Sequence, residues 1–335
     1  MWERPRATLT AAAFVGIAAL LVRGVAVFAR EALYRAAAMK TVRILLQTTI
    51  PETRDDWHIG RFSLLERHLA SLHEKGVRFD VVSRNIERGA DGADEVLSKL
   101  AESDFDELWI FAVDVGDGLT RADCAGIDAF RRRGGGVLTA RDHQDLGCSL
   151  LTLDGLGSGN FFHSKNPDPI AHNRRIDDTE TTTISWPNFH SGSNGDTQSV
   201  TPVLPVHELL SNPARRGGVV ERFPAHPHEG AVGVPAGSGV ARVVATGTSK
   251  RTGRAFNLAV AFDDERDSEG RLLGRAVAES SFHHFADYNW DTRTGAPSFV
   301  TEPPTLATAN DPSLLDDIKV YVANVARWLR PVSAR

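Results

Sequence analysis

The chain has 335 residues, of which 41% are hydrophobic and 24% are charged, proportions that are ordinary for a globular protein with one large or two small domains. A formal net charge of −5 and the shortness of its basic runs exclude the positively charged surface of a nucleic-acid-binding protein. The two cysteines, Cys124 and Cys148, are too few for a disulfide framework.

Residues 1–38 leave three interpretations open. Residues 9–28 are apolar except for one arginine and follow two others, as in a signal anchor, but their uninterrupted part is shorter than the roughly 20 residues that span a bilayer. A cleaved signal is the second interpretation, although the small-residue run Ala36–Ala38 lies far beyond the apolar stretch. The third is an upstream extension, which we favour because Met39 directly precedes the first predicted strand. If translation starts at Met39, we expect a cytoplasmic protein. If residues 9–28 are also translated, we expect a protein that is anchored to a membrane.

From Met39 onward, apolar runs typical of buried strands alternate with helical patterns. Strands are predicted at 42–48, 78–83, 107–113 and 137–140, and helices at 61–74, 93–101 and 120–133. Thr120 can cap the third helix, with Asp123 in the position that a capping box requires. This alternation predicts an α/β fold, a flavodoxin-like doubly wound domain with a mostly parallel sheet.

A long loop-rich insertion, about residues 151–225, interrupts the alternation. It is rich in Gly, Asn, Ser, Thr, Pro and His, and a loop of this length in a compact domain is usually functional or disordered. Its aromatic residues favour an ordered insertion. Strand-like segments return at 241–245, 255–262 and 275–279, and 312–329 is an amphipathic helix. Residues 39–335 are therefore predicted to form one domain.

Two segments resemble known proteins. Gly134–His143 (GGGVLTARDH) resembles the strand and sharp turn that display the nucleophile in the class I glutamine amidotransferase-like superfamily. Gly274–His284 (GRAVAESSFHH) is similar to the "GRVFYTSLGH" segment of the ThuA-like (trehalose utilisation) branch. The resemblance implies a flavodoxin-like fold and a hydrolase or related enzyme that acts on a small polar, carbohydrate-derived substrate.

The chain departs from the superfamily at the nucleophile. The turn falls on Arg141 or Asp142 where a cysteine would be expected, and acyl transfer in this superfamily needs a thiolate. Cys148 lies several residues beyond the turn. We therefore do not expect glutaminase activity.

Nine of the twelve histidines fall between His143 and His284, and several follow predicted strands. Ligands bind at the carboxyl ends of strands in open α/β sheets, so the turn at 141–143, the segment 226–229 and the pair 283–284 should meet there. We predict as catalytic residues Asp142, His143, Glu229, His283 and His284; as metal ligands His226 and His228; and as ligand-binding residues Arg141, Trp57 and His190.

His226 and His228 can point to one side of an extended backbone that the intervening proline favours. Together with Asp142 and either His283 or His284 they would make a nitrogen and oxygen ligand set for Zn²⁺, Fe²⁺ or Mn²⁺. Glu229 would then be the base that acts on a metal-bound water.

Other interpretations stay open, because solvated histidines, a helix-capping Asp142 and a structural turn at 283–284 would give the same pattern. The alternative function is a non-catalytic small-molecule-binding module, tethered to a membrane through residues 9–28. The partner in either case is a small molecule and not a nucleic acid, and the sequence leaves the metal and the oligomeric state undetermined.

Overall fold

The computed structural model describes residues 39–331 except residues 75, 178–180 and 182, so the predictions for residues 1–38 lie outside the described residues. In the part of the chain that is described, no helix has the length and apolar character needed to cross a membrane. The contacts separate two units. The smaller one contains residues 39–41 and 73–78, and the larger one contains the rest of the described chain, including every functional feature discussed below.

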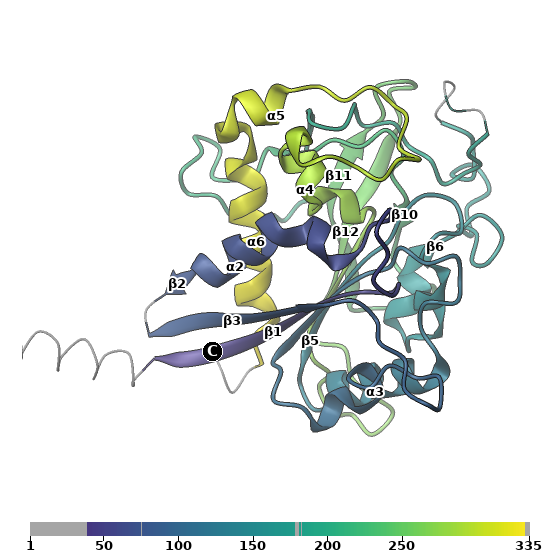
Figure 1. Ribbon diagram of the computed structural model, residues 1–335, viewed down its shortest axis with the longest axis vertical. Helices are drawn as coiled ribbons and strands as arrows, with labels where there is room; N and C mark the ends of the chain where they lie inside the picture. Colours follow the sequence, from purple (N-terminus) through teal and green to yellow (C-terminus); the bar gives the residue numbers. More distant parts are fainter. Residues whose placement is uncertain (1–38, 75, 178–180, 182, 332–335) are drawn as a thin grey trace, which may run out of the picture. The chain divides into compact units, whose positions relative to one another are not determined.

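One mixed sheet of nine strands, in the order β2-β3-β1-β4-β5-β13-β12-β11-β8, organises the described chain (Figure 1). The strands are β1 Lys40–Thr48, β2 His73–Glu74, β3 Val77–Arg84, β4 Glu107–Phe111, β5 Gly136–Ala140, β8 Thr201–Pro202, β11 Ala241–Thr248, β12 Ala255–Phe262 and β13 Ala276–Glu279. Strands β1, β4, β5 and β13 pair in parallel, whereas β12, β11 and β8 extend the sheet antiparallel. The predicted α/β class with a mostly parallel core is therefore confirmed, and it is consistent with a flavodoxin-like fold.

Helices cover both faces of this sheet: α2 and α6 lie together on one side, and α3 lies on the other (Figure 1). The α-helices are α2 Ser63–Ser71, α3 Arg121–Arg132, α4 Asp287–Trp290, α5 Ala307–Asn310 and α6 Asp316–Leu329. The 3₁₀ helices are η1 Ile59–Phe62, η2 Leu97–Glu102, η3 Cys148–Thr152, η4 Leu156–Gly159, η5 Glu208–Leu210, η6 Phe282–His284, η7 Thr292–Thr294 and η8 Pro312–Leu315. On the α3 side, Ile127 and Phe130 pack with β-strand residues in a fully buried cluster. Burial of such side chains is worth about 1.5–3 kcal/mol each.

Two predicted helices are shorter in the structure than in the sequence analysis. Helix α2 ends at Ser71, because Leu72 is extended and residues 73–74 pair as β2. The helix predicted at 93–101 is replaced by η2, which contains a non-helical residue, Lys99. The Asp94 carboxylate lies before this 3₁₀ helix and accepts from the backbone N–H of Leu97, its first residue, at 2.8 Å.

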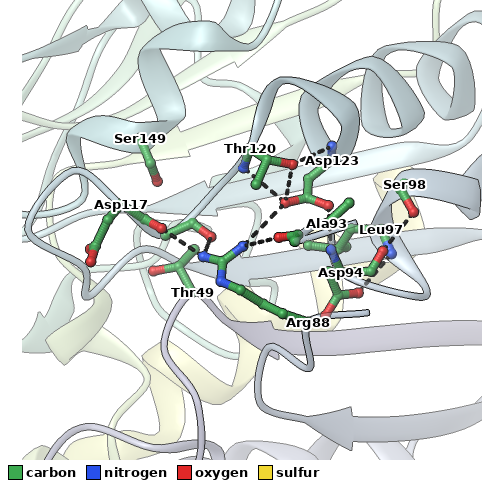
Figure 2. A network of polar contacts seen from close by, with 12 residues as sticks. Thr49, Arg88, Ala93, Asp94, Leu97, Ser98, Asp117, Thr120, Asp123 and Ser149 are labelled. Atoms are coloured by element: carbon green, nitrogen blue, oxygen red, sulfur yellow. Dashed lines mark hydrogen bonds and ion pairs between the residues drawn. The ribbon is translucent and has the colours of Figure 1, made fainter. Parts of the chain in front are cut away.

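A polar network ties the start of α3 to the start of η2 (Figure 2). Thr120 and Asp123 form the predicted capping box, with the Thr120 amide donating to the Asp123 carboxylate at 2.8 Å. The other carboxylate oxygen of Asp123 accepts from the backbone N–H of Asp94 at 2.7 Å. Beside it, the Arg88 guanidinium lies 3.9 Å from Asp123 and donates to the carbonyl of Asp117 at 2.6 Å. One buried carboxylate thus joins two helix starts.

Most of the predicted insertion is ordered. It contributes η3, η4, η5 and the strands β6 Asn160–Phe161, β7 Thr197–Ser199 and β9 Arg222–Pro224. Strand β6 pairs with β10 Ala231–Val232, and β7 pairs with β9. Its aromatic side chains are buried, and Phe189 stacks on Phe256 of β12 with ring centroids 4.8 Å apart.

His207 fastens this insertion to α6 and should make the protein sensitive to acid. Its ring packs edge-on against Trp328 at 5.2 Å and accepts from the backbone N–H of Leu209 at 3.2 Å. Burial lowers its pKa to about 4, against about 6.5 in an unfolded chain. The unfolded state therefore binds more protons between these values, so this group's effect on stability becomes less favourable as the pH falls through 6.5 toward 4.

We expect His207→Asn to reduce the loss of unfolding free energy between pH 7 and pH 5 by about 2 kcal/mol. Asparagine keeps an acceptor for the first turn of η5, so the structural role is retained. Urea unfolding at both pH values measures the difference, with His172→Asn, at an exposed position, as the control. An unchanged pH dependence in His207→Asn would contradict the prediction.

Candidate functional site

Three segments that are distant in the sequence converge at one edge of the sheet. Strands β5 and β13 are parallel neighbours, so the residues that follow them, Asp142 and His283, emerge at the same edge. The loop between β9 and β10 brings His226 to the same place. One ligand atom of each of these buried residues lies within 4.8 Å of the others. The convergence of the three segments predicted from the sequence is thus observed.

Gly230 permits this close approach. A Cβ atom at this position would lie 2.5 Å from the carbonyl oxygen of Ser280 and 2.6 Å from that of Asp142, distances that real side chains do not adopt. The Gly230 amide instead donates to the Ser280 carbonyl at 3.1 Å. Any side chain here would push the histidine-bearing loop away from the ends of β5 and β13.

Asn289 of α4 determines the protonation of His283. The Asn289 side-chain amide donates to the backbone carbonyl of Ala225 at 2.8 Å, and since a carbonyl can only accept, this contact fixes which end of the amide is nitrogen. The oxygen end then faces Nδ1 of His283 at 3.2 Å. His283 must therefore carry its proton on Nδ1, which leaves the Nε2 lone pair available.

The same amide determines the protonation of His226 through Asn194. Asn289 Nδ2 also donates to Oδ1 of Asn194 at 2.9 Å, and that oxygen contacts Nδ1 of His226 at 3.0 Å. His226 must then also donate from Nδ1. The two imidazole rings stack with centroids 3.5 Å apart. Metal-ligating histidines are typically held in this way, with the non-ligating nitrogen donating to a fixed acceptor.

Burial keeps both rings uncharged. It lowers the pKa of His226 well below its ordinary value, with His283 adding to the effect, and it lowers the pKa of His283 to about 4. Burial also raises the pKa of Asp142, against the opposing influence of His283. Neutral imidazole is the form that binds metal ions, and a bound cation would favour the ionised form of Asp142.

Asn289→Leu should weaken metal binding about 10- to 100-fold, the range for loss of a residue that orients metal ligands. The substitution removes both the acceptor for His283 and the donor to Asn194 while nearly preserving side-chain volume. Competition with a chromogenic zinc chelator measures the affinity. The control is Asn257→Leu in β12, which removes a partly buried amide contact to the Val232 carbonyl of β10. Equal zinc affinity in the two variants would show that Asn289 has only a structural role.

A cavity of about 340 Å³ opens above Asp142, His226 and His283. Trp57, predicted to bind ligand, lines it and packs edge-on against His283 at 4.7 Å. The other residues that line the cavity are Asp56, Val113, Val115, His143, Leu146, Ile184, His228, Phe299, Val300 and Glu302.

His228 and Glu302 form a polar pair in this cavity. His228 Nδ1 lies 3.0 Å from Oδ1 of Asn188, and Nε2 lies 3.0 Å from a carboxylate oxygen of Glu302. Each ring nitrogen of His228 thus has an oxygen within hydrogen-bond distance. Burial opposes ionisation of Glu302, but the hydrogen bond from His228 and the backbone hydrogen bonds to the carboxylate together lower the pKa of the carboxyl. His228 was predicted to be a metal ligand, but in the structure its Nε2 atom faces the Glu302 carboxylate.

His143 is the remaining histidine of the cavity. Burial lowers its pKa to about 3, so the ring is neutral. Its centroid lies 5.5 Å from that of His228, and its Nδ1 is buried without a hydrogen-bond partner among the described residues. A neutral imidazole with a free nitrogen can accept a proton.

Two predicted ligand-binding residues lie outside the cavity. Arg141 is fully buried, donates to the Gln144 carbonyl at 2.6 Å and places its guanidinium 4.0 Å from the Phe162 ring centroid. These contacts hold the start of the insertion against the sheet, which is a structural role. His190 is buried and does not line the cavity; its backbone carbonyl accepts from Lys250 at 2.8 Å.

Two predicted catalytic residues belong to a separate buried network. His284 places Nε2 3.2 Å from the Glu229 carboxylate and Nδ1 3.4 Å from the Glu279 carboxylate, and all three side chains are 0% exposed. Burial lowers the pKa of His284, but the two carboxylates overcome this effect and raise it to about 9. Glu229 also accepts from Gln198 at 2.6 Å and Ser191 at 2.9 Å. This carboxylate is therefore fully engaged away from the cavity, where it cannot act as a base on a metal-bound water.

The turn after β5 contains no cysteine in residues 141–147. The residue with a left-handed backbone in this turn is Gln144, at φ 48°. Cys148 does not line the cavity, and burial, together with Asp114, raises the pKa of its thiol. A nucleophilic thiol requires the opposite shift.

Sequence reasoning missed Asn289 and Glu302, and it did not assign a positioning role to Asn188 and Asn194, which turn formation explains equally well. Glu302 lies in an irregular segment 74 residues from its partner His228. The density of Asn and His in the insertion was a local signal for Asn188 and Asn194 alone.

No family model and no curated protein matches the chain. The solved structures that match include two weak neighbours. One is described as the mmIFT52 N-terminal domain, with 10% identity and a TM-score of 0.40 over 74% of this chain and 89% of that chain. The other is described as a "putative GMP synthase" component from Thermoplasma acidophilum, with 10% identity and a TM-score of 0.34 over 86% of this chain and 96% of that chain.

Proposed function

We propose that Asp142, His226 and His283 bind one divalent metal ion, Zn²⁺, Fe²⁺ or Mn²⁺, and that the chain is a metal-assisted hydrolase of a small molecule. One observation carries the proposal. Two neutral imidazoles with available Nε2 atoms and one carboxylate offer ligand atoms within 4.8 Å of one another beneath a cavity. Three protein ligands and an open position are typical of catalytic metal sites.

The surrounding residues suit hydrolysis. A metal ion bound there would act as a Lewis acid toward a carbonyl oxygen. His143, which is neutral, is placed to accept a proton from the attacking water. The hydrogen-bonded pair of His228 and Glu302, joined at 3.0 Å, would supply a proton to the leaving group. The cavity thus contains a proton acceptor and a second polar pair for general acid–base catalysis.

Membership of the ThuA-like branch of the amidotransferase-like superfamily remains part of this proposal. It rests on the resemblance of Gly274–His284, and His283 of that segment is one of the proposed ligands. The carbohydrate-derived substrate that the resemblance implies is a separate prediction, because the metal-binding argument does not depend on it.

Elemental analysis of the purified full-length chain after incubation with Zn²⁺, Fe²⁺ or Mn²⁺ and dialysis tests the metal site. We expect close to one ion per chain, lost in His226→Ala and retained in His228→Ala, because only His226 belongs to the three-residue cluster. His172→Ala, at an exposed position, is the control. Hydrolysis of 4-nitrophenyl esters should follow the metal content.

Two results would overturn the proposal. Absence of a stoichiometric metal in a folded wild-type chain would remove the metal site. Stoichiometric metal with ligand-induced stabilisation but no turnover would instead support the non-catalytic binding module.

A further inference from the structure

The walls of the cavity differ in chemistry from its base. Half of its fourteen lining residues are hydrophobic, among them Trp57, Leu146, Ile184, Phe299 and Val300. Three of the polar residues adjoin the proposed ligands. The His228 ring centroid lies 5.6 Å from that of His226 and 5.5 Å from that of His143, and His228 contacts Glu302 at 3.0 Å. A substrate that fills this cavity must therefore present a polar group at the base and an apolar group along the wall.

The rim carries hydrophobic side chains that the fold leaves in water. Phe299 is 57% exposed and Val115 is 77% exposed, although both line the cavity. Scattered exposed apolar residues are common, but apolar residues that gather around a concave site rich in polar groups mark a ligand-binding surface. Contact with a ligand would remove these two side chains from water.

The charge of the cavity excludes anionic substrates. None of the described residues that line it is a lysine or arginine, whereas Asp56, Asp142 and Glu302 are acidic. A phosphate or carboxylate would meet these acids without a fixed cation other than the metal. A sugar would leave most of its hydroxyl groups against apolar side chains, and unpaired buried polar groups cost about 1–3 kcal/mol each.

We propose that the substrate is an uncharged ester or amide with a short alkyl or aryl acyl group. The acyl group contacts the hydrophobic wall, and the carbonyl oxygen faces the metal site. The inference rests on the proposed hydrolase function and replaces its carbohydrate-derived substrate. In the reaction, the oxygen of water bonds to the carbonyl carbon and the bond to the ester oxygen or amide nitrogen breaks. The leaving group takes a proton, which gives a carboxylic acid and an alcohol or amine.

The volume limits the size of the acyl group. About 340 Å³ lies at the lower end of the roughly 300–1,000 Å³ typical of small-molecule sites. An acyl group of a few carbons to one ring fits this space, whereas a long fatty chain would project beyond the rim.

Calorimetric titration of the zinc-loaded full-length chain with acetyl-, butyryl- and hexanoyl-hydroxamic acid tests the inference. The hydroxamate chelates the metal in each ligand, so the series varies only the alkyl tail. Each buried methylene should tighten binding about fourfold, or about 200-fold from acetyl to hexanoyl. The effect should be smaller in Phe299→Ser and unchanged in Ile170→Ser, whose residue is 60% exposed and does not line the cavity.

The outcomes separate this inference from the proposed function. Equal affinity for the three hydroxamates would overturn the acyl substrate and leave the metal site intact, as would faster turnover of 4-nitrophenyl glycosides than of 4-nitrophenyl hexanoate. If the affinity of Phe299→Ser depended on tail length as strongly as that of the wild type, the assignment of the acyl group to this wall would also be overturned. A chain that takes up no zinc would refute the proposed function itself, and the inference with it.

Discussion

A His284→Gln variant should lose about 3–5 kcal/mol of unfolding free energy at neutral pH, the cost of removing one partner from a buried ion pair. His284 lies between the carboxylates of Glu229 and Glu279 with no exposed surface on any of the three. Its pKa is raised to about 9 against the effect of burial, so the ring is charged at neutral pH. Without this cation, two acidic groups would face each other in the protein interior. Urea unfolding of the metal-free chain measures the loss and keeps it separate from any effect on metal binding.

A second substitution distinguishes this electrostatic cause from simple loss of packing. Glu229→Gln keeps an oxygen that can accept from Gln198 and Ser191 but removes one buried negative charge. The double variant should therefore be more stable than the sum of the two single effects predicts, by about 0.5–3 kcal/mol. Strict additivity in this double-mutant cycle would mean that the charges of His284 and Glu229 are not coupled.

Glu302→Gln should reduce kcat for 4-nitrophenyl ester hydrolysis about 10²- to 10⁴-fold, the range for loss of general acid–base assistance. The carboxylate accepts from Nε2 of His228 at 3.0 Å, and although burial raises its pKa, this bond and backbone hydrogen bonds together lower it. The uncharged amide would be a weaker hydrogen-bond acceptor for His228 than the carboxylate. Metal content should stay unchanged, because Glu302 is outside the cluster of three candidate ligands.

The matched control is Glu265→Gln, which also removes a partly buried carboxylate, paired with Arg131 at 2.8 Å and away from the cavity. Its kcat should equal that of the wild type. If Glu302→Gln instead lost metal, or kept full kcat with normal metal content, the assigned role would be wrong.

Local patterns were sufficient to predict the parallel core of the sheet. The apolar runs of β1, β4 and β5 follow from burial of both faces, and the capping box of α3 is a short-range signal. The prediction was wrong at 93–101. The apolar spacing there is helical, but Lys99 has a non-helical backbone and the 3₁₀ helix η2 forms in place of an α-helix.

The sequence was sufficient to single out Asp142 and the histidines of the candidate site, but not the residues that hydrogen-bond to them. Residues that follow parallel strands must meet at one edge, so Asp142 and His283 could be placed from topology alone. The sequence could not show that His283 lines the cavity whereas His284 lies in the buried carboxylate network. Adjacent side chains point in different directions and so reach different environments. Asn289 lies six residues from His283, but only its contact with the Ala225 carbonyl reveals its function.

The Asp123 carboxylate also has a consequence for how the chain opens. It joins the first turn of α3 to the backbone before η2 through hydrogen bonds at 2.8 and 2.7 Å. Neither segment can fray without leaving a buried acceptor unpaired, so the two should open together as one cooperative unit. In amide hydrogen exchange, the protected N–H groups at both starts would then share one opening free energy, although they come from separate parts of the sequence.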